Sequence, residues 1–341
     1  MSHRNICITA VDGNTGSSIA KYILENESFK KKVGTVTGLA LDQNAPHAKE
    51  VQKLGAKIIQ HKPGRIKQMV ELLKSTGADA VCLIPPASEK KLEITQELIE
   101  ATKRAGIPNV CFISSAGCDL ADPQKQPRLR EFIELEAQVL VAKGNPQTEA
   151  GHSPVVIRPG FYAENLLLYA PQILQEKSIP LPIGSNHKFA PMALRDLAQV
   201  ASHVLTGKGK QGFSDRHRGQ LMVLTGPKLV AGEELATDVS QALGDELQFE
   251  DISENEAKSV LQEQSSLDPS EMQYLLEYYS LVKEGKTNYI STTAFHDVTG
   301  QHPLEPPEFF KEMKKVLETE VGAENGQEEG PKSKKRKANG K

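Results

Sequence analysis

Short runs of apolar residues alternate, along the first half of the chain, with stretches whose apolar positions recur every three or four residues. The runs are typical of buried β-strands, and the stretches are typical of helices that bury one face. The predicted strands cover residues 5–11, 33–41, 56–60, 80–84, 110–114 and 155–158. The predicted helices cover residues 15–24, 45–54, 66–75, 92–105 and 128–142. This alternation indicates βαβ crossovers and a parallel sheet covered by helices on both faces.

The second half of the chain alternates less regularly. It predicts helices over residues 194–205, 233–243 and 272–282 and one strand over 220–224. We therefore predict an α/β fold, a Rossmann-type doubly wound parallel sheet, in a domain over residues 1–160 whose sheet is completed by later segments. A smaller C-terminal α/β lobe for substrate or partner is predicted over 161–320. From Val321 the composition turns to Gly, Glu and Lys without apolar periodicity, which predicts a disordered basic tail over 321–341.

Composition narrows the classes of function. The chain has 341 residues and a formal net charge of -3, so no global field recruits nucleic acid or an anionic membrane. Neither a secretory signal nor a run of about 18 apolar residues is present, which predicts an intracellular, soluble protein with no membrane partner. No His or Cys has metal-ligand spacing, so no metal is predicted. The four cysteines lie in apolar runs and are expected to be buried thiols.

A glycine-containing turn follows the first predicted strand and opens the first predicted helix. It consists of Ala10, Val11, Asp12, Gly13, Asn14, Thr15 and Gly16. Small residues at positions 13 and 16 let a pyrophosphate approach the N–H groups at the start of a helix. The turn therefore predicts a dinucleotide site, and the alternative is a tight turn between strand and helix that binds no ligand.

The second predicted strand ends at the sequence LALDQN, in which Asp42 is acidic and no Arg is present. In dinucleotide-binding folds this strand end contacts the ribose of the adenosine, and an acidic residue accepts hydrogen bonds from its hydroxyl groups. Asp42 therefore favours NAD over NADP. The alternative is that Asp42 only caps the helix that follows.

Four sequence blocks together are similar to one known family. They are AVDGNTG (10–16), DAVCLIPP (79–86), NVCFISSAG (109–117) and SPVVIRPGFYAENLL (153–167), and further blocks follow at 189–205, 221–236 and 297–312. With these blocks the chain resembles the NmrA-like family of atypical short-chain dehydrogenases/reductases. The resemblance implies a Rossmann domain with a small C-terminal lobe. Family members include NADP-binding redox sensors, transcriptional corepressors that bind GATA-type factors, and reductases of quinones or isoflavones.

The resemblance also implies further cofactor-binding residues at the ends of later strands. Besides the turn and Asp42, these are His61, Ile84, Pro85, Pro86, Ser114, Pro159, Gly160 and Phe161. Three positions depart from the family pattern. Ala10 replaces the first glycine, Asp42 falls where a basic residue is common, and His61-Lys62 replaces a Gly-Asp pair. The cofactor is therefore predicted to be NAD or NADP, with the preference open.

The residues that would transfer a proton are harder to predict. Hydride transfer to a carbonyl needs a proton donor beside the nicotinamide. Reductases of the family use a Lys at the start of the helix before the RPG strand, but here residues 131–137 place Glu there. No Tyr-x-x-x-Lys pattern occurs nearby, so no cation is expected at this point. Ser114, Ser115 and Tyr162 remain as candidate polar groups, although Tyr162 is also suited to packing in the wall of the pocket.

A basic run, from Lys332 to Lys337, lies in the predicted tail. It predicts a nuclear address, or else a solubilising tail balanced by nearby Glu residues, so the expected location is the cytoplasm, the nucleus or both.

Three functional hypotheses follow from these residues. The first is a dinucleotide-binding regulator that lacks the Tyr/Lys pair and responds to redox state or acts on transcription, with a transcription factor as partner. The second is an NAD(P)H-dependent reductase of a small carbonyl or quinone. The third is a scaffold that has lost the cofactor. The sequence does not indicate an oligomeric state.

Overall fold

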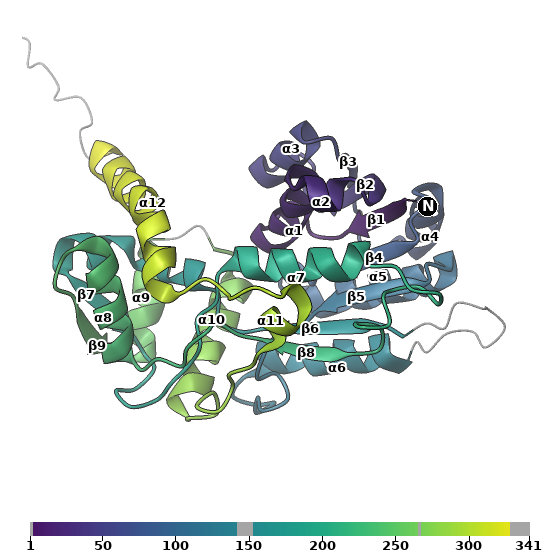
Figure 1. Ribbon diagram of the computed structural model, residues 1–341. Coiled ribbons are helices and arrows are strands. Elements are labelled where there is room, and N and C mark those ends of the chain that lie inside the picture. The colour runs from purple at the N-terminus through teal and green to yellow at the C-terminus, as the bar shows by residue number, and fades with distance from the viewer. Residues whose placement is uncertain (1–2, 142–152, 265–266, 328–341) are drawn as a thin grey trace, which may run out of the picture.

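A seven-stranded parallel sheet forms the centre of the molecule, with the strand order β3-β2-β1-β4-β5-β6-β8 (Figure 1). The computed structural model describes residues 3–141, 153–264 and 267–327. The strands of the sheet are β1 (Arg4–Ile8), β2 (Val33–Ala40), β3 (Lys57–Gln60), β4 (Ala80–Leu83), β5 (Asn109–Ile113), β6 (Val155–Pro159) and β8 (Leu221–Leu224). The strand order runs outward in both directions from the β1–β4 pair, which confirms the predicted doubly wound fold. In such sheets ligands bind outside the carboxyl ends of the strands at this switch point.

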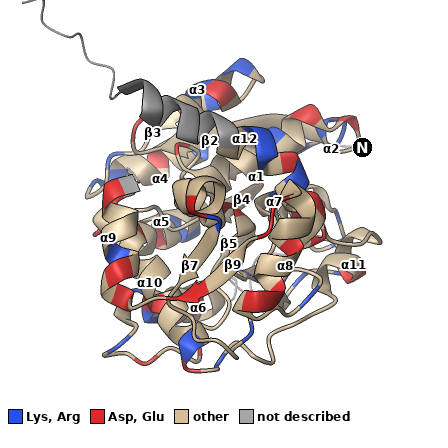
Figure 2. Cartoon of the chain, turned by 90° about the vertical axis from the view of Figure 1, so that its left-hand side faces the viewer, with Lys and Arg blue, Asp and Glu red and all other residues tan. Residues whose placement is uncertain are grey.

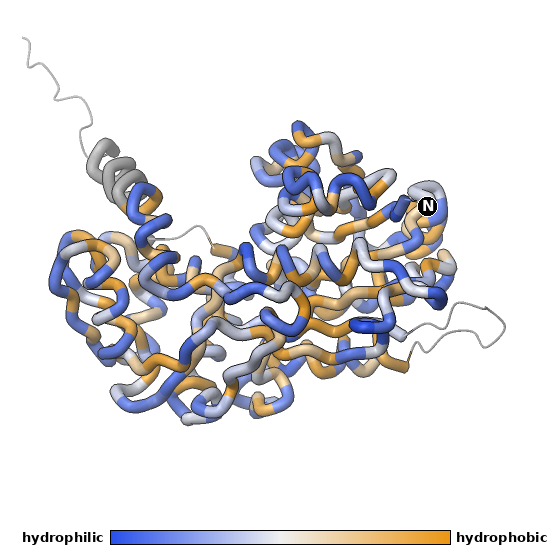
Figure 3. The backbone as a smooth tube through the Cα atoms, in the orientation of Figure 1, coloured by the Kyte–Doolittle hydropathy of each residue, from blue (hydrophilic) through white to orange (hydrophobic). Residues whose placement is uncertain are grey.

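Helices cover both faces of the sheet. Those that pack against it or against one another are α1 (Asn14–Glu25), α2 (Glu27–Lys30), α3 (Pro46–Lys53), α4 (Ile66–Ser75), α5 (Lys91–Ala105), α6 (Pro127–Val141), α7 (Leu194–Thr206) and α11 (Ala294–Thr299). Residues of α1, α3 and α7 share one core with Ile6 and Ile8 of β1, whereas residues of α4, α5 and α6 share the other with Cys7. Because successive side chains of a strand point to opposite faces, Ile6, Cys7 and Ile8 of β1 supply both cores. Figure 3 shows hydrophobic colour along the strands and more polar colour on the outer helices.

A third core lies beyond the carboxyl ends of the strands. It is built from η1 (Ala163–Tyr169), η2 (Gln172–Glu176), β7 (Ser178–Leu181), α8 (Gly232–Leu243), β9 (Gln248–Asp251), α9 (Glu254–Gln264), α10 (Pro269–Lys283) and α12 (Pro306–Gln327). The parallel pair β7–β9 was not predicted from the sequence. Its strands have four residues each, and β9 (QFED) has one apolar position, so neither carries a periodic signal.

The C-terminal helix reaches further than the sequence pattern indicated. The tail was expected to begin at Val321, but α12 continues to Gln327. The basic run from Lys332 to Lys337 lies outside the described residues.

The turn after β1 contains a non-glycine residue in the left-handed region, because Ala10 has a φ of 51°. We expect Ala10→Gly to stabilise the protein by up to about 1 kcal/mol, since left-handed backbone costs an L-residue about 1–2 kcal/mol and glycine's freedom in the unfolded chain offsets only part of that. Urea unfolding of both proteins measures the difference. Ala137→Gly, at an exposed position inside α6, is the matched control and should cost about 1 kcal/mol. Equal destabilisation by both substitutions would contradict the proposed strain at Ala10.

Candidate functional site

The turn between β1 and α1 leaves helix N–H groups available to a ligand. A Cβ atom added to Gly16 would lie 2.3 Å from the Ala10 carbonyl oxygen and 2.7 Å from that of Thr9, so the close packing of this turn requires glycine there. A Cβ atom at Gly13 would meet only the Ala10 oxygen, at 3.5 Å, so packing alone does not require glycine at that position. No side chain caps α1, and its first turn has no acidic residue. These features fit the approach of a pyrophosphate.

Acidic groups gather where β2 ends. The Asp12 carboxylate accepts a hydrogen bond from the Asp42 amide at 2.9 Å, which brings the two carboxylates to the same strand end. The Asp42 carboxylate itself accepts from the Asn44 amide at 2.9 Å. Because α3 begins at Pro46 with Ala45 as its cap residue, Asp42 closes a local turn and is not the N-cap of that helix.

His61 lies at the end of the neighbouring strand. Its amide donates to the Ala40 carbonyl at 2.7 Å, and its ring is buried. Burial lowers the pKa of His61, which the negative charges of Glu97 and Asp12 oppose. Its Nε2 has no hydrogen-bond partner within the described part of the chain. A buried imidazole nitrogen without a partner beside the predicted adenosine position fits a bound nucleotide.

A cavity extends from the glycine turn along the carboxyl ends of β4, β5 and β6 to the first turns of α10. Its lining residues are Thr15, Ile84, Pro85, Pro86, Ala87, Ser88, Lys91, Ile113, Ser114, Arg128, Phe132, Pro159, Tyr162, Ser270, Glu271 and Tyr274. The structure thus brings seven predicted site residues together: Thr15, Ile84, Pro85, Pro86, Ser114, Pro159 and Tyr162. Parallel strands place these residues at one edge although they are far apart in sequence.

Three other predicted residues lie behind this cavity and do not line it. Val11 is buried in the core beneath α1. Gly160 donates its amide to the Leu224 carbonyl at 2.8 Å, which joins β6 to β8. The Phe161 ring packs among aromatic rings of the third core, with its centroid 5.2 Å from that of Phe189.

A buried ion pair fixes α6 to β6. The Arg158 guanidinium donates to both Glu136 carboxylate oxygens, at 2.8 and 2.7 Å, and also pairs with Asp119 at 3.0 Å. The Ser114 hydroxyl donates to the same Glu136 carboxylate. The proton of the predicted candidate Ser114 is therefore directed at Glu136.

The other two candidate polar groups have different surroundings. The Tyr162 hydroxyl lies 3.5 Å from the Thr15 hydroxyl in the wall of the cavity, and burial raises the pKa of Tyr162. Ser115 is buried and does not line the cavity, but its hydroxyl lies 2.9 Å from that of Tyr274 on α10.

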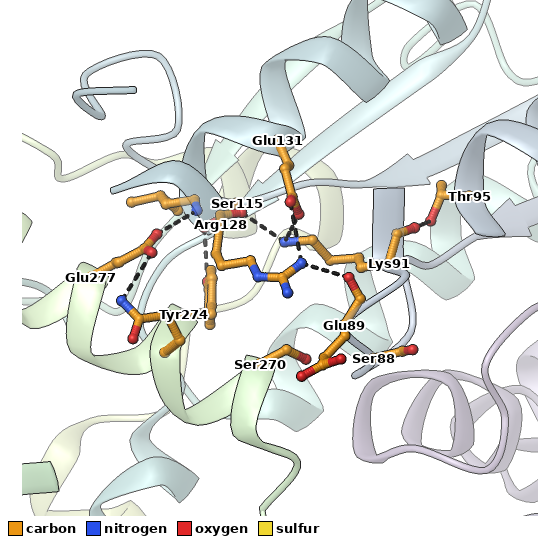
Figure 4. Close-up of polar contacts among 12 residues, drawn as sticks. Ser88, Glu89, Lys91, Thr95, Ser115, Arg128, Glu131, Ser270, Tyr274 and Glu277 are labelled. Carbon is orange, nitrogen blue, oxygen red and sulfur yellow. Dashed lines mark hydrogen bonds and ion pairs between the residues drawn. The ribbon is translucent and has the colours of Figure 1, made fainter. Parts of the chain in front are cut away.

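Lys91 is a candidate functional residue that sequence reasoning missed, as it also missed Tyr274. It is the first residue of α5, is 8% exposed, and lines the cavity. Its ammonium group donates to the Arg128 carbonyl at 2.7 Å and pairs with Glu131 at 3.2 Å (Figure 4). It also lies 4.3 Å from the Phe132 ring centroid. The expectation that no cation stands beside residues 131–137 is therefore wrong, because a lysine from another helix fills that place.

Two carboxylates of α10 have separate places: one connects α10 to α6, and the other lines the cavity. Glu277 of α10 accepts a hydrogen bond from the Leu129 amide of α6 at 2.8 Å. Glu271 lines the cavity, and burial raises its pKa. Burial lowers the pKa of Lys91, whereas the Glu131 carboxylate favours its charged form.

Neither a metal site nor a membrane-spanning helix occurs among the described residues. Within residues 3–141, 153–264 and 267–327, no group of three or more His, Cys, Asp or Glu side chains is placed to hold a metal ion. Across the same residues, no helix combines the length and apolar character needed to cross a membrane.

The Glu136–Arg158 pair allows a direct test of what holds α6 in place. We expect Arg158→Met to lower the free energy of unfolding by about 3–5 kcal/mol, because it leaves a buried carboxylate without its cation. Urea unfolding measures this loss. Glu100→Gln removes the partner of Arg104 in an exposed pair and should cost less than about 0.5 kcal/mol. A similar small loss for Arg158→Met would show that α6 does not depend on the pair.

With this geometry established, three comparisons place the chain among known proteins. It is 28% identical to the NAD(P)H azoreductase of Xenophilus azovorans over 258 residues, which cover 75% of this chain and 80% of the azoreductase. The NADPH-dependent quinone oxidoreductase of Escherichia coli, solved with NADPH, superposes with a TM-score of 0.71 at 18% identity, over 91% of this chain and 99% of the other. NmrA, a negative transcriptional regulator solved with NAD, gives a TM-score of 0.70 at 14% identity, over 94% and 98%.

The sequence profile of one family covers nearly the whole described chain. The match runs from residue 2 to residue 316 and so includes the glycine turn, every strand of the main sheet, and α10. The resemblance seen in the sequence blocks is thereby confirmed. The chain belongs to the NmrA-like family.

Proposed function

We propose that this protein is an NAD(P)H-dependent oxidoreductase that reduces a small conjugated acceptor, such as a quinone or a carbonyl compound. The observation that carries the proposal is the single cavity joining the glycine turn to side chains of α5, α6 and α10. Such a cavity suits a cofactor and an acceptor that must meet. A pocket with apolar walls and a few convergent polar groups is typical of small-molecule sites.

The residues present fit a dinucleotide. The turn over 10–16 would hold the pyrophosphate, and Asp12, Asp42 and His61 would surround the adenosine half. Ser114 and Pro159 line the part of the cavity nearest the strand ends. When bound in its reduced form, the dinucleotide supplies a hydride; the protein supplies orientation and electrostatics.

The charges at the end of β2 favour NADH over NADPH. Asp12 and Asp42 lie together there, and both would repel a 2′-phosphate, whereas Asp42 suits ribose hydroxyls. No Arg stands in the segment from Leu39 to Asn44.

The walls of the cavity favour a flat acceptor with a polar end. Ile84, Pro85, Pro86 and Phe132 provide apolar surface, while Lys91 and Tyr274 provide a cation and a hydroxyl. Relatives named as an azoreductase and as a quinone oxidoreductase support acceptors of this kind.

The regulatory hypothesis rests on fewer features. The likeness to NmrA, at 14% identity, shows a shared fold and does not extend to a regulatory role. The basic run that suggested the nucleus lies outside the described residues. Acidic and basic residues are mixed over the elements seen in Figure 2. A transcription-factor partner and a nuclear location therefore stay predictions from the sequence.

Binding of the dinucleotide is tested with Gly13→Asp. We expect wild type to bind a dinucleotide and Gly13→Asp to bind at least about tenfold more weakly, because a carboxylate would meet the pyrophosphate at the helix start. Calorimetric titration with NAD, NADH, NADP and NADPH measures the affinities. Because a side chain at Gly13 has room, we expect the thermal stability of this variant to be unchanged. The weaker binding is then not caused by loss of folding. Failure of wild type to bind any of the four would overturn the proposal and favour the scaffold hypothesis.

Turnover and cofactor preference are tested together. Wild type should oxidise NADH faster than NADPH in the presence of a panel of quinones, azo dyes and carbonyls, followed by the loss of reduced-nicotinamide absorbance. Asp42→Asn removes one of the two carboxylates, so the NADH/NADPH ratio of kcat/KM should fall about tenfold, equivalent to ~1.4 kcal/mol. Asp215→Asn, an exposed change on the segment before β8, is the control. Binding without turnover across the panel would favour the regulator instead.

A further inference from the structure

We propose that Tyr274 donates the proton that completes reduction of the acceptor, and that Lys91 stabilises the tyrosinate left behind. This inference rests on the proposed reductase function and assigns its proton donor. Neither residue belongs to a Tyr-x-x-x-Lys pattern, since Lys91 begins α5 and Tyr274 lies in α10. The fold brings the two together at one end of the cavity.

The hydroxyl of Tyr274 is oriented by a buried serine. Ser115 is 1% exposed, and its Oγ lies 2.9 Å from the Tyr274 hydroxyl. The other acceptor near Ser115 Oγ, the Ala116 carbonyl, is farther away at 3.4 Å. When Ser115 donates to Tyr274, the phenolic proton is left for a molecule in the cavity that Tyr274 lines.

The ammonium group of Lys91 lies over the same ring. Its Nζ is 5.8 Å from the Tyr274 ring centroid and is buried. Arg128 and Glu131 of α6 hold it there by the contacts shown in Figure 4. A cation so held stabilises negative charge that develops on the phenol, more strongly than in water because the surroundings are poorly polarisable.

The charges around Tyr274 come from several elements. The pKa of Tyr274 is raised to about 12: burial is the largest cause, the hydrogen bond from Ser115 opposes it, and the neighbouring Cys118, Glu271 and Glu277 add to the rise. Lys91, Arg128 and Glu131 face it from α5 and α6. Tyr274 is therefore protonated at neutral pH, as a donor must be, and Lys91 is the cation nearest its ring among the described contacts.

The proton and electron balance is simple. The bound reduced dinucleotide supplies a hydride with its electron pair to the acceptor, so the dinucleotide is oxidised and the acceptor gains two electrons. The π electrons displaced in the acceptor move to its polar atom, which forms a new bond to the proton of Tyr274. The Tyr274 O–H bond breaks and its electrons stay on the oxygen as tyrosinate. Water entering the cavity after the product leaves returns a proton to Tyr274.

Kinetics test the donor. We expect Tyr274→Phe to lower kcat about a hundredfold with little change in dinucleotide affinity, because a positioned general acid contributes about 10²–10⁴-fold. Tyr289→Phe, at a side chain that is 90% exposed, is the matched control and should behave as wild type. Wild-type turnover matched by Tyr274→Phe at every pH would overturn the inference and leave the reductase function standing. No turnover by wild type would overturn both.

A second measurement needs neither cofactor nor acceptor. Fluorotyrosine incorporated throughout the protein lowers phenol pKa values into the range in which the protein stays folded, and fluorine NMR follows each titration. The Tyr274 resonance is assigned as the one that is missing from the spectrum of Tyr274→Phe. If that variant does not fold, the Tyr274 resonance is assigned as the one that shifts in Ser115→Ala, since the two hydroxyl groups are in contact. We expect Lys91→Met to raise its pKa by about one unit, the low end for loss of a nearby opposite charge.

Two control variants distinguish the loss of the Lys91 charge from a change in the structure around it. Lys91→Arg keeps the cation and should leave the Tyr274 titration within a few tenths of a unit of wild type. Lys90→Met removes the neighbouring exposed lysine and should have no effect. Because Glu131 also pairs with Arg128, Lys91→Met does not leave that carboxylate without a cation. An unchanged Tyr274 titration in Lys91→Met would overturn the role assigned to Lys91.

Discussion

The close approach of Gly16 to the Thr9 and Ala10 carbonyls is the constraint on which the site depends. It lets α1 start directly above the end of β1, and it forces Ala10 into left-handed backbone. A helix that starts there presents its N–H groups at the edge where β4, β5 and β6 also end. Position 16 is therefore fixed by packing, whereas position 13 has room for a side chain, as we expect where a bound pyrophosphate and not the fold requires glycine.

Helix α6 is the second support of the site, because groups within residues 128–136 contact both β6 and Lys91. Glu136 binds Arg158 and fixes the helix to β6, while Glu131 and the Arg128 carbonyl hold the Lys91 ammonium group. Glu277 then joins α10 to the start of α6. Two of the three Glu residues within 131–137 have separate tasks: Glu136 anchors the helix, and Glu131 pairs with a lysine supplied by α5.

The dinucleotide half of the site could be predicted because its determinants are local. A strand, a turn with small residues and a helix are contiguous over residues 4–25, and their order along the chain is also their order in space. Residues after later strands, such as Pro85, Ser114 and Pro159, were predicted from the family resemblance, and they line one cavity because parallel strands end at one edge. The place of Asp42 in a local turn, and not at a helix cap, follows from α3 beginning at Pro46, four residues further along the chain.

The proposed acceptor half could not be predicted in the same way because its residues meet only through tertiary packing. Lys91 shares a helix face with Ile94 and Leu98, both buried, and that periodicity was a signal that its side chain points inward. What the face packs against was not visible in the sequence, since α6 and α10 are distant along the chain. The two halves of the site therefore depend on the fold to different degrees. The turn and strand ends are tied to the fold, whereas Lys91, Phe132 and Tyr274 are single side chains on three helices. We therefore expect substitution at Phe132, in the wall of the cavity, to change the acceptor without disturbing the cofactor site, which gives a physical reason why one fold accommodates relatives named for azo and quinone reduction.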